Sequence, residues 1–166
     1  MHQLPTDPRA EVQALKPTSR RAIHRPWFIS GAVLFLDQLT KAFVQAAWVL
    51  DERHPFLPPV VYFTYVQNTG AAFGLFKGQQ WLFVPVSVVV IGWILREWRL
   101  APGREPVTRW AEALILGGTV GNLMDRLRFG YVVDFLDLRV WPVFNVGDSA
   151  ITIGVTLLMW RALQKR

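Results

Sequence analysis

Long apolar blocks are the feature that most limits how this chain can fold. A soluble domain spaces its apolar residues so that one face of each helix or strand stays polar. Here several stretches are apolar on every side, which lipid tolerates and water does not. Apolar residues make up 52% of the 166 residues, and eight Trp and eleven Phe lie among them. The pattern predicts a polytopic membrane protein.

Four of these blocks qualify as membrane spans, each of which needs about 20 mainly apolar residues to cross the hydrocarbon core. Trp lies at many of their ends, as in the aromatic belt of a bilayer interface. We therefore predict an all-α, four-transmembrane-helix bundle over residues 27–163. It is preceded by a cytoplasmic tail at 1–26 that we expect to be disordered and followed by a short cytoplasmic tail at 164–166. The expected spans are residues 27–48, 81–98, 110–124 and 147–163.

Lys and Arg are distributed unevenly between the segments that join these spans. They gather before the first span, between the second and third, and after the fourth, whereas the other two loops mix them with Asp and Glu. By the positive-inside rule, both termini face the cytoplasm and the two acidic loops face outward. The tail has scattered charge and no apolar core, so it does not read as a cleavable signal peptide.

The outer loop at residues 49–80 has predicted structure of its own. Residues 60–66 are dense in β-branched and aromatic side chains and predict a strand. Pro55, Pro58 and Pro59 before it indicate irregular chain. The apolar stretch at residues 71–76 is too short to span, and it is either a short interfacial helix or a buried loop.

Composition excludes several kinds of site. There is no Cys, which rules out disulfides and thiol catalysis, and the three His are scattered in the tail and a loop, so we expect no metal and no cofactor. The net charge of +6 could suggest nucleic-acid binding. The basic residues, however, form short clusters between apolar blocks, so we expect no nucleic-acid partner.

Asp37 and Lys41 lie in the middle of the first span, where a lone charge costs roughly 2.5–3.5 kcal/mol. At i and i+4 they share a helical face and can pair. Either the pair fixes helix packing, or one member orients a reacting group. The segment Asn68-Thr69-Gly70 after the predicted strand is typical of a turn, although an Asn side chain there could also hold a peptide carbonyl.

The third span ends in a run of small and polar residues. Its glycines permit close approach of a neighbouring helix, at positions 117, 118 and 121. Asn122 and Asp125 are three apart and share a face if the helix continues. Arg126 can form a fork on a carboxylate. For Asp125 and Arg126, an interfacial ion pair is the leading interpretation.

Two further aspartates, Asp134 and Asp148, lie among apolar neighbours near the outer ends of spans. Asp148 or Ser149 could equally be the cap of the fourth helix. Two carboxyl groups that lie close together cannot both ionise, so one keeps a proton. The ionised member can then take a proton from water while the protonated member polarises a carbonyl. A proton-coupled transporter and a non-catalytic scaffold are the alternatives.

Five motifs follow one another in a fixed order along these segments. Together they resemble the bacterial lipoprotein signal peptidase family, also called signal peptidase II, over about residues 27–163. The motifs are Asp37-Gln38-Leu39-Thr40-Lys41, Asn68-Thr69-Gly70-Ala71-Ala72-Phe73, Gly121-Asn122-x-x-Asp125-Arg126, Val132-Val133-Asp134-Phe135 and Phe144-Asn145-x-x-Asp148-Ser149. Gly147, where the family usually has Ala, departs from the pattern.

The resemblance implies an aspartyl endopeptidase of the bacterial inner membrane that cleaves prolipoproteins just before a diacylglyceryl-modified cysteine. It implies that Asp134 and Asp148 form the catalytic pair. It also implies a small extracytoplasmic β-cradle, a short interfacial helix, and membrane lipid and lipid-modified precursors as partners of a monomeric enzyme. The residues that it assigns to substrate binding and support are Asn68, Asn122, Asp125, Arg126, Asn145, Asp37 and Lys41.

Overall fold

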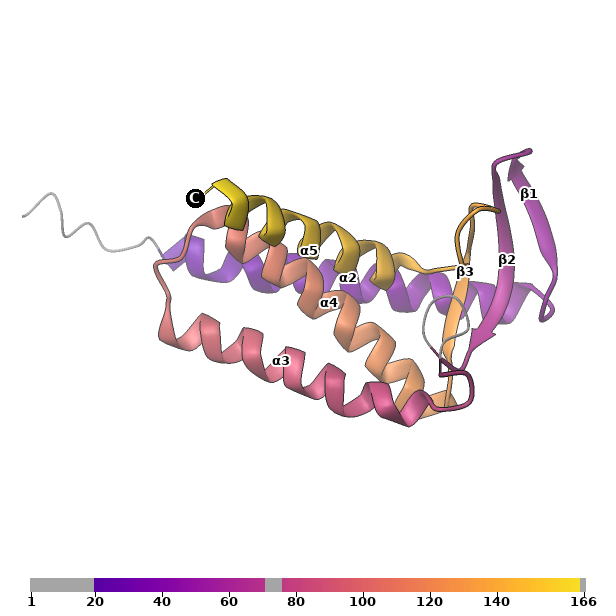
Figure 1. Ribbon diagram of the computed structural model, residues 1–166, viewed down its shortest axis with the longest axis horizontal. Coiled ribbons are helices and arrows are strands. Elements are labelled where there is room, and N and C mark those ends of the chain that lie inside the picture. Colours follow the sequence, from indigo (N-terminus) through magenta and orange to yellow (C-terminus); the bar gives the residue numbers. More distant parts are fainter. Residues whose placement is uncertain (1–19, 71–75, 165–166) are drawn as a thin grey trace, which may run out of the picture.

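The computed structural model describes residues 20–70 and 76–164, and most of this chain is helical. The long helices lie side by side as a bundle, with the sheet at one end of it (Figure 1). The start of the first helix and the C-terminus lie at the opposite end. We call these the sheet end and the terminal end. The long helices are α2 (Arg20–Ala47), α3 (Phe83–Leu100), α4 (Pro106–Phe129) and α5 (Val146–Gln164).

Three helical segments are long and apolar enough to cross a membrane: residues Arg25–Ala47 of α2, the segment Gln80–Leu100 that joins the short helix η2 (Gln80–Leu82) to α3, and α5. They carry large apolar side chains on the outside of the bundle. Phe28 is 80% exposed and Val89 is 69% exposed, as in a surface that faces lipid. The chain is therefore a membrane protein, and these three segments overlap three of the four predicted spans.

The helix α4 contains the remaining predicted span, residues 110–124, but extends further at both ends. Its composition is less apolar than that of the other helices because charged residues such as Glu112 and Asp125 lie on it. Both side chains are buried, and α4 packs against α2, α3 and α5. Neighbouring helices therefore surround much of α4, and at about 1.5 Å per residue its 24 residues are long enough for a 30 Å hydrocarbon core.

Glycines on α4 bring two neighbouring helices unusually close. A Cβ atom on Gly118 would overlap the backbone oxygen of Gly147 at the start of α5. A Cβ atom on Gly121 would overlap the carboxylate of Asp37 on α2. The close approach predicted from these small residues is confirmed, and it places polar groups of three helices within hydrogen-bond range.

The sheet is antiparallel, with strand order β1-β2-β3. Its strands are β1 (Arg53–Leu57), β2 (Val61–Asn68) and β3 (Val132–Asp137). The strand predicted at residues 60–66 is confirmed as β2. The prediction of irregular chain around Pro55 is wrong, because Pro55 pairs with Tyr62 inside β1. A proline fits an edge strand, where its missing N–H is not needed by a second neighbour.

An apolar cluster attaches the sheet to the bundle. Val44 on α2 packs with Tyr65 on β2 and with Val133 and Phe135 on β3, and all four are buried. This contact fixes β3 across the end of the bundle, between the end of α4 and the start of α5. The predicted interfacial helix at residues 71–76 lies almost entirely outside the described residues.

Candidate active site

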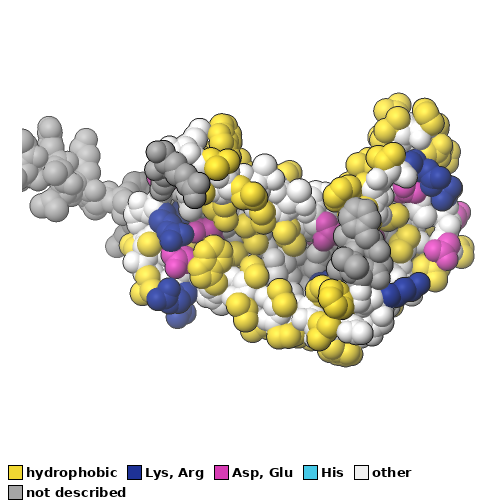
Figure 2. Space-filling model, in the orientation of Figure 1, with side chains coloured by type: hydrophobic (Ala, Val, Ile, Leu, Met, Phe, Trp, Pro, Cys, Tyr) yellow, Lys and Arg dark blue, Asp and Glu magenta, His cyan; other side chains and the backbone are white. Residues whose placement is uncertain are grey.

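The two predicted catalytic aspartates meet where the sheet joins the bundle. Asp134 lies in the middle of β3, opposite Val66 of β2, and is only 1% exposed. Asp148 lies in the first turn of α5 and is partly exposed. Figure 2 shows acidic side chains in the hollow between the helices and the sheet. The site therefore combines one fully buried carboxyl group with one that remains accessible.

Asn145 connects the two carboxyl groups. Its Nδ2 donates to Asp134 Oδ1 at 2.7 Å, and its Oδ1 accepts the backbone N–H of Asp148 at 2.8 Å. Asp148 Oδ2 in turn accepts the backbone N–H of Asn145 at 3.4 Å, which completes a capping box. Asn145 is thus the cap of α5, and Asp148 is its partner three residues later rather than the cap itself.

Two more amides hold the pair from either side. Asn68 Nδ2, at the end of β2, donates to Asp134 Oδ2 at 2.9 Å. Asn122 Nδ2, on α4, donates to Asp148 Oδ1 at 2.7 Å. Asn68 also accepts the backbone N–H of Gly70 at 2.9 Å, so the predicted turn and a contact within the site occur together. Every one of these amide donors is neutral.

A buried ion cluster lies on the bundle side of the pair. Lys41 Nζ contacts Asp37 at 2.8 Å and Asp125 at 2.9 Å, which confirms the predicted Asp37–Lys41 pair. Lys41 also donates to Asn122 Oδ1 at 2.8 Å. Because the amide oxygen of Asn122 is held by Lys41, its nitrogen is directed at Asp148.

The same cluster positions the backbone that carries the aspartates. Asp37 Oδ1 accepts the N–H of Gly147, next to Asp148, at 2.8 Å. Asp125 Oδ2 accepts the N–H of Val133, next to Asp134, at 3.1 Å. Each carboxylate of the ion cluster therefore fixes the residue that precedes one aspartate of the pair.

The predicted ion pair between Asp125 and Arg126 is wrong. Asp125 pairs with Lys41 instead, and the Arg126 guanidinium lies 5.0 Å from the ring centroid of Phe83. Consecutive residues of a helix point in different directions, so the two side chains of such a pair do not face each other. Arg126 Nε is buried and has no hydrogen-bond partner among the described residues.

Electrostatics separate Asp134 from an ordinary carboxyl group. Burial, and then the negative charge of Asp148, raise the pKa of Asp134 to about 7, while hydrogen bonds from Asn68 and Asn145 and the charge of Lys41 oppose the shift. A carboxyl group with this pKa carries a proton for much of the time near neutral pH. The arrangement can therefore present one protonated and one ionised carboxyl group to a substrate.

Gln38 is a site residue to which sequence reasoning gave no role. Its Nε2 donates to Asp125 Oδ1 at 3.0 Å and to the backbone oxygen of Gly121 at 3.2 Å. It thereby holds the side of Asp125 that Lys41 does not reach. A polar amide next to Asp37 inside an apolar span was the available signal.

Known proteins resemble this chain in both sequence and structure. The model of the family described as signal peptidase (SPase) II matches residues 29–164. Lipoprotein signal peptidases of Pelotomaculum thermopropionicum and Moorella thermoacetica are 47% and 50% identical, over 82% and 79% of this chain and 90% and 87% of their own lengths. A structure described as a bacterial membrane enzyme solved by the in meso method has a TM-score of 0.81 at 27% identity and covers 86% of this chain and 89% of its own. The chain belongs to the signal peptidase II family.

Proposed function

We propose that this protein is an intramembrane aspartyl endopeptidase that removes signal peptides from diacylglyceryl-modified prolipoproteins by cutting just before the lipidated cysteine. The observation that carries the proposal is the pair Asp134 and Asp148, bridged by Asn145. Among the described residues, no Lys or Arg forms an ion pair with either carboxyl group. The names of the relatives supply the class of substrate.

The reaction uses one proton of the pair and one water molecule. Asp148 lies at the N-terminus of α5, where the helix dipole favours negative charge, so it is the ionised base at rest. It takes a proton from water as the water oxygen attacks the peptide carbonyl carbon. Asp134, which is protonated, donates a hydrogen bond to the carbonyl oxygen. When the C–N bond breaks, a proton from the pair passes to the leaving amine.

The residues around the pair support this reaction in two ways. Asn68, Asn122 and Asn145 hold the carboxyl groups in place through their amide nitrogens. Arg126, whose buried Nε has no hydrogen-bond partner among the described residues, would bind a carbonyl oxygen of the substrate backbone through its guanidinium group.

The proposed role of Asp37, Lys41 and Asp125 is indirect, because they position residues that hold or adjoin the catalytic aspartates. Their ion pairs and backbone contacts set the positions of Asn122, Gly147 and Val133. No metal or cofactor takes part in the proposed reaction, and one copy of the chain supplies both aspartates. We therefore propose a monomeric enzyme.

In this proposal all four long helices cross the inner membrane. The sheet end then faces outward, and both termini face the cytoplasm. The clustering of Lys and Arg before α2, between α3 and α4, and at the end of α5 supports this orientation. The burial of α4 among the other helices supports its crossing in spite of its charges.

A cleavage assay with the purified full chain tests the function. A diacylglyceryl-modified precursor should be cut once, and mass spectrometry should find the lipidated cysteine at the new N-terminus. The matched control is the same precursor with the modifiable cysteine replaced by serine, which should remain intact. A proton-coupled transporter or a scaffold would leave both precursors whole, and that outcome would remove the proposal.

A further inference from the structure

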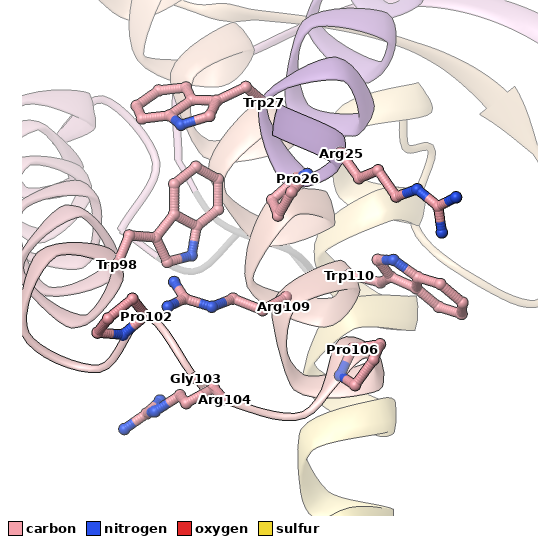
Figure 3. Close-up of a pocket in the computed structure, with 10 residues that line it drawn as sticks. All are labelled: Arg25, Pro26, Trp27, Trp98, Pro102, Gly103, Arg104, Pro106, Arg109 and Trp110. Carbon is pink, nitrogen blue, oxygen red and sulfur yellow. The ribbon is translucent and has the colours of Figure 1, made fainter. Parts of the chain in front are cut away.

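The terminal end of the bundle, far from the aspartate pair, contains a second concave site. A cavity of about 320 Å³ lies between the start of α2, the end of α3 and the start of α4 (Figure 3). Its wall is made of aromatic, proline and arginine side chains. Those that carry the argument are Arg25, Trp27, Trp98, Arg104, Arg109 and Trp110.

One side of the cavity is organised around a buried acid. Glu112, which is 0% exposed, accepts Trp98 Nε1 at 2.8 Å and Arg104 Nη1 at 2.6 Å, and Arg109 Nη1 lies 3.9 Å from it. Arg104 also pairs with Glu97. Trp27 packs edge-on against Trp98 with ring centroids 4.7 Å apart. This wall is preformed, and its charges are largely matched.

The opposite side of the cavity carries polar groups that have no hydrogen-bond or ion-pair partner among the described residues. Arg25 is exposed and makes no ion pair or hydrogen bond with the described residues. Trp110 is 42% exposed, and its indole N–H likewise has no described acceptor. Figure 3 shows the two side chains next to each other, across the cavity from Trp27 and Trp98. Glu97 and Glu112 are set against Arg104 and Arg109, whereas Arg25 has no acidic partner among the described residues.

We propose that this cavity binds the headgroup of an anionic phospholipid from the leaflet at the terminal end. The phosphate would bind the Arg25 guanidinium, whose planar fork of donors suits phosphate oxygens. The Trp110 N–H would donate to a second headgroup oxygen, and the acyl chains would follow the exposed apolar surface that begins at Phe28, which is 80% exposed.

Three properties favour a lipid over a soluble anion. Tryptophans at the end of a bundle mark the level of the lipid headgroups. A basic cavity between membrane helices is a recurring site for acidic lipids. The proline and tryptophan walls, finally, would contact glycerol and acyl carbons, which inorganic phosphate lacks. The inference depends on the helices lying in a membrane and not on the peptidase reaction.

Native mass spectrometry of the full-length protein, titrated with phosphatidylglycerol or phosphatidylcholine in detergent, tests the proposal. One tightly bound phosphatidylglycerol is expected per chain, with weaker phosphatidylcholine binding. Arg25→Gln should weaken phosphatidylglycerol binding about fivefold, the effect of one interfacial cation. The matched control is Arg99→Gln, which removes an exposed charge at the same end of the bundle but outside the cavity. It should leave the affinity unchanged.

Three results would overturn the proposal. Equal affinity for the two lipids would exclude recognition of the negative charge. Equal losses in Arg25→Gln and Arg99→Gln would mean that diffuse surface charge, and not this cavity, attracts the lipid. Displacement of the bound lipid by millimolar inorganic phosphate would identify a site for soluble anions.

Discussion

The two ends of the bundle both hold buried carboxyl groups, but in opposite electrostatic settings. At the terminal end, Glu112 receives hydrogen bonds from Arg104 and Trp98, with Arg109 close by. At the sheet end, Asp134 receives its side-chain hydrogen bonds from Asn68 and Asn145. One acid is held by cations and the other by neutral amides.

The type of hydrogen-bond donor therefore separates a structural carboxyl group from a chemically active one within the same fold. A buried carboxylate that contacts cations stays ionised and holds its neighbours together. A carboxyl group held by neutral amides keeps its position and can still exchange a proton. Even Lys41 is kept from the pair by one residue, because it contacts Asp37 and Asp125, and Asn122 stands between it and Asp148.

Loss of either aspartate of the pair should have the largest effect. Asp134→Asn or Asp148→Asn should reduce the rate of prolipoprotein cleavage by about ten-thousandfold, because each removes a proton-transfer group. The matched control is Asp137→Asn on the same strand, since Asp137 contacts Thr64 and Arg139 instead of the pair. Near-normal cleavage by either pair variant would contradict the assignment.

A cation placed against Asp134 should give this carboxyl group an electrostatic setting like that of Glu112 at the terminal end. In Asn68→Lys, the ammonium group would favour the ionised form of Asp134, so cleavage should fall on the order of a hundredfold. Asn68→Ala removes the same amide without adding charge and should reduce the rate less. Equal cleavage rates of the two variants in a steady-state assay would show that the protonation state of Asp134 does not control the cleavage rate.

A substitution at the terminal end should change the stability of the protein and leave its cleavage activity unchanged. Glu112→Gln removes the charge that Arg104 and Arg109 share, and should lower the free energy of unfolding by about 3 kcal/mol. Cleavage per folded molecule should stay at the level of the unaltered protein. Denaturant unfolding measures the first quantity, with Glu52→Gln, a partly exposed acid, as control. A drop in cleavage per folded molecule would couple the two ends.

The smallest effect, taken over one pH unit, should be a pH dependence of stability. Because the folded pKa of Asp134 is about 7 and its ordinary value is 3.8, the folded state holds a proton that the unfolded state releases between these values. The free energy of unfolding should therefore fall as pH rises from about 4 to 7, by roughly 1 kcal/mol per pH unit from this group. Thermal unfolding in detergent should show that slope, and Asp134→Asn should lack it.

The sequence predicts the helices better than it predicts the sheet. Apolar blocks identify α2, α3 and α5, because lipid-facing helices are apolar over most of their length. The ends of α4 lie beyond the predicted residues 110–124. Hydropathy misses them because charged residues such as Glu112 and Asp125, which are buried against other helices, make α4 less apolar. The strand β1 is missed because it contains Pro55, which usually indicates irregular chain. The strand β3 is a short segment around Asp134 that can be recognised only from its pairing with β2.

In the site, too, contacts within one helix are predictable from the sequence, whereas contacts between distant segments are not. The contact between Asp37 and Lys41 follows from helical spacing, so sequence alone predicts it. The contact between Lys41 and Asp125 joins two helices, and Asn145 reaches Asp134 only because β3 lies against the start of α5. Such partners depend on the packing of distant segments. Spacing also misleads for Arg126, whose neighbour in sequence is not its partner in space.

The most direct test is an infrared titration of the carboxyl groups in the purified protein. We expect a protonated-carboxyl carbonyl band that disappears with an apparent pKa of about 7, is absent from Asp134→Asn and is retained in Asp137→Asn. If no such band titrates near neutral pH, or if it survives in Asp134→Asn, then Asp134 does not hold the proton and the proposed division of roles between the two aspartates is wrong.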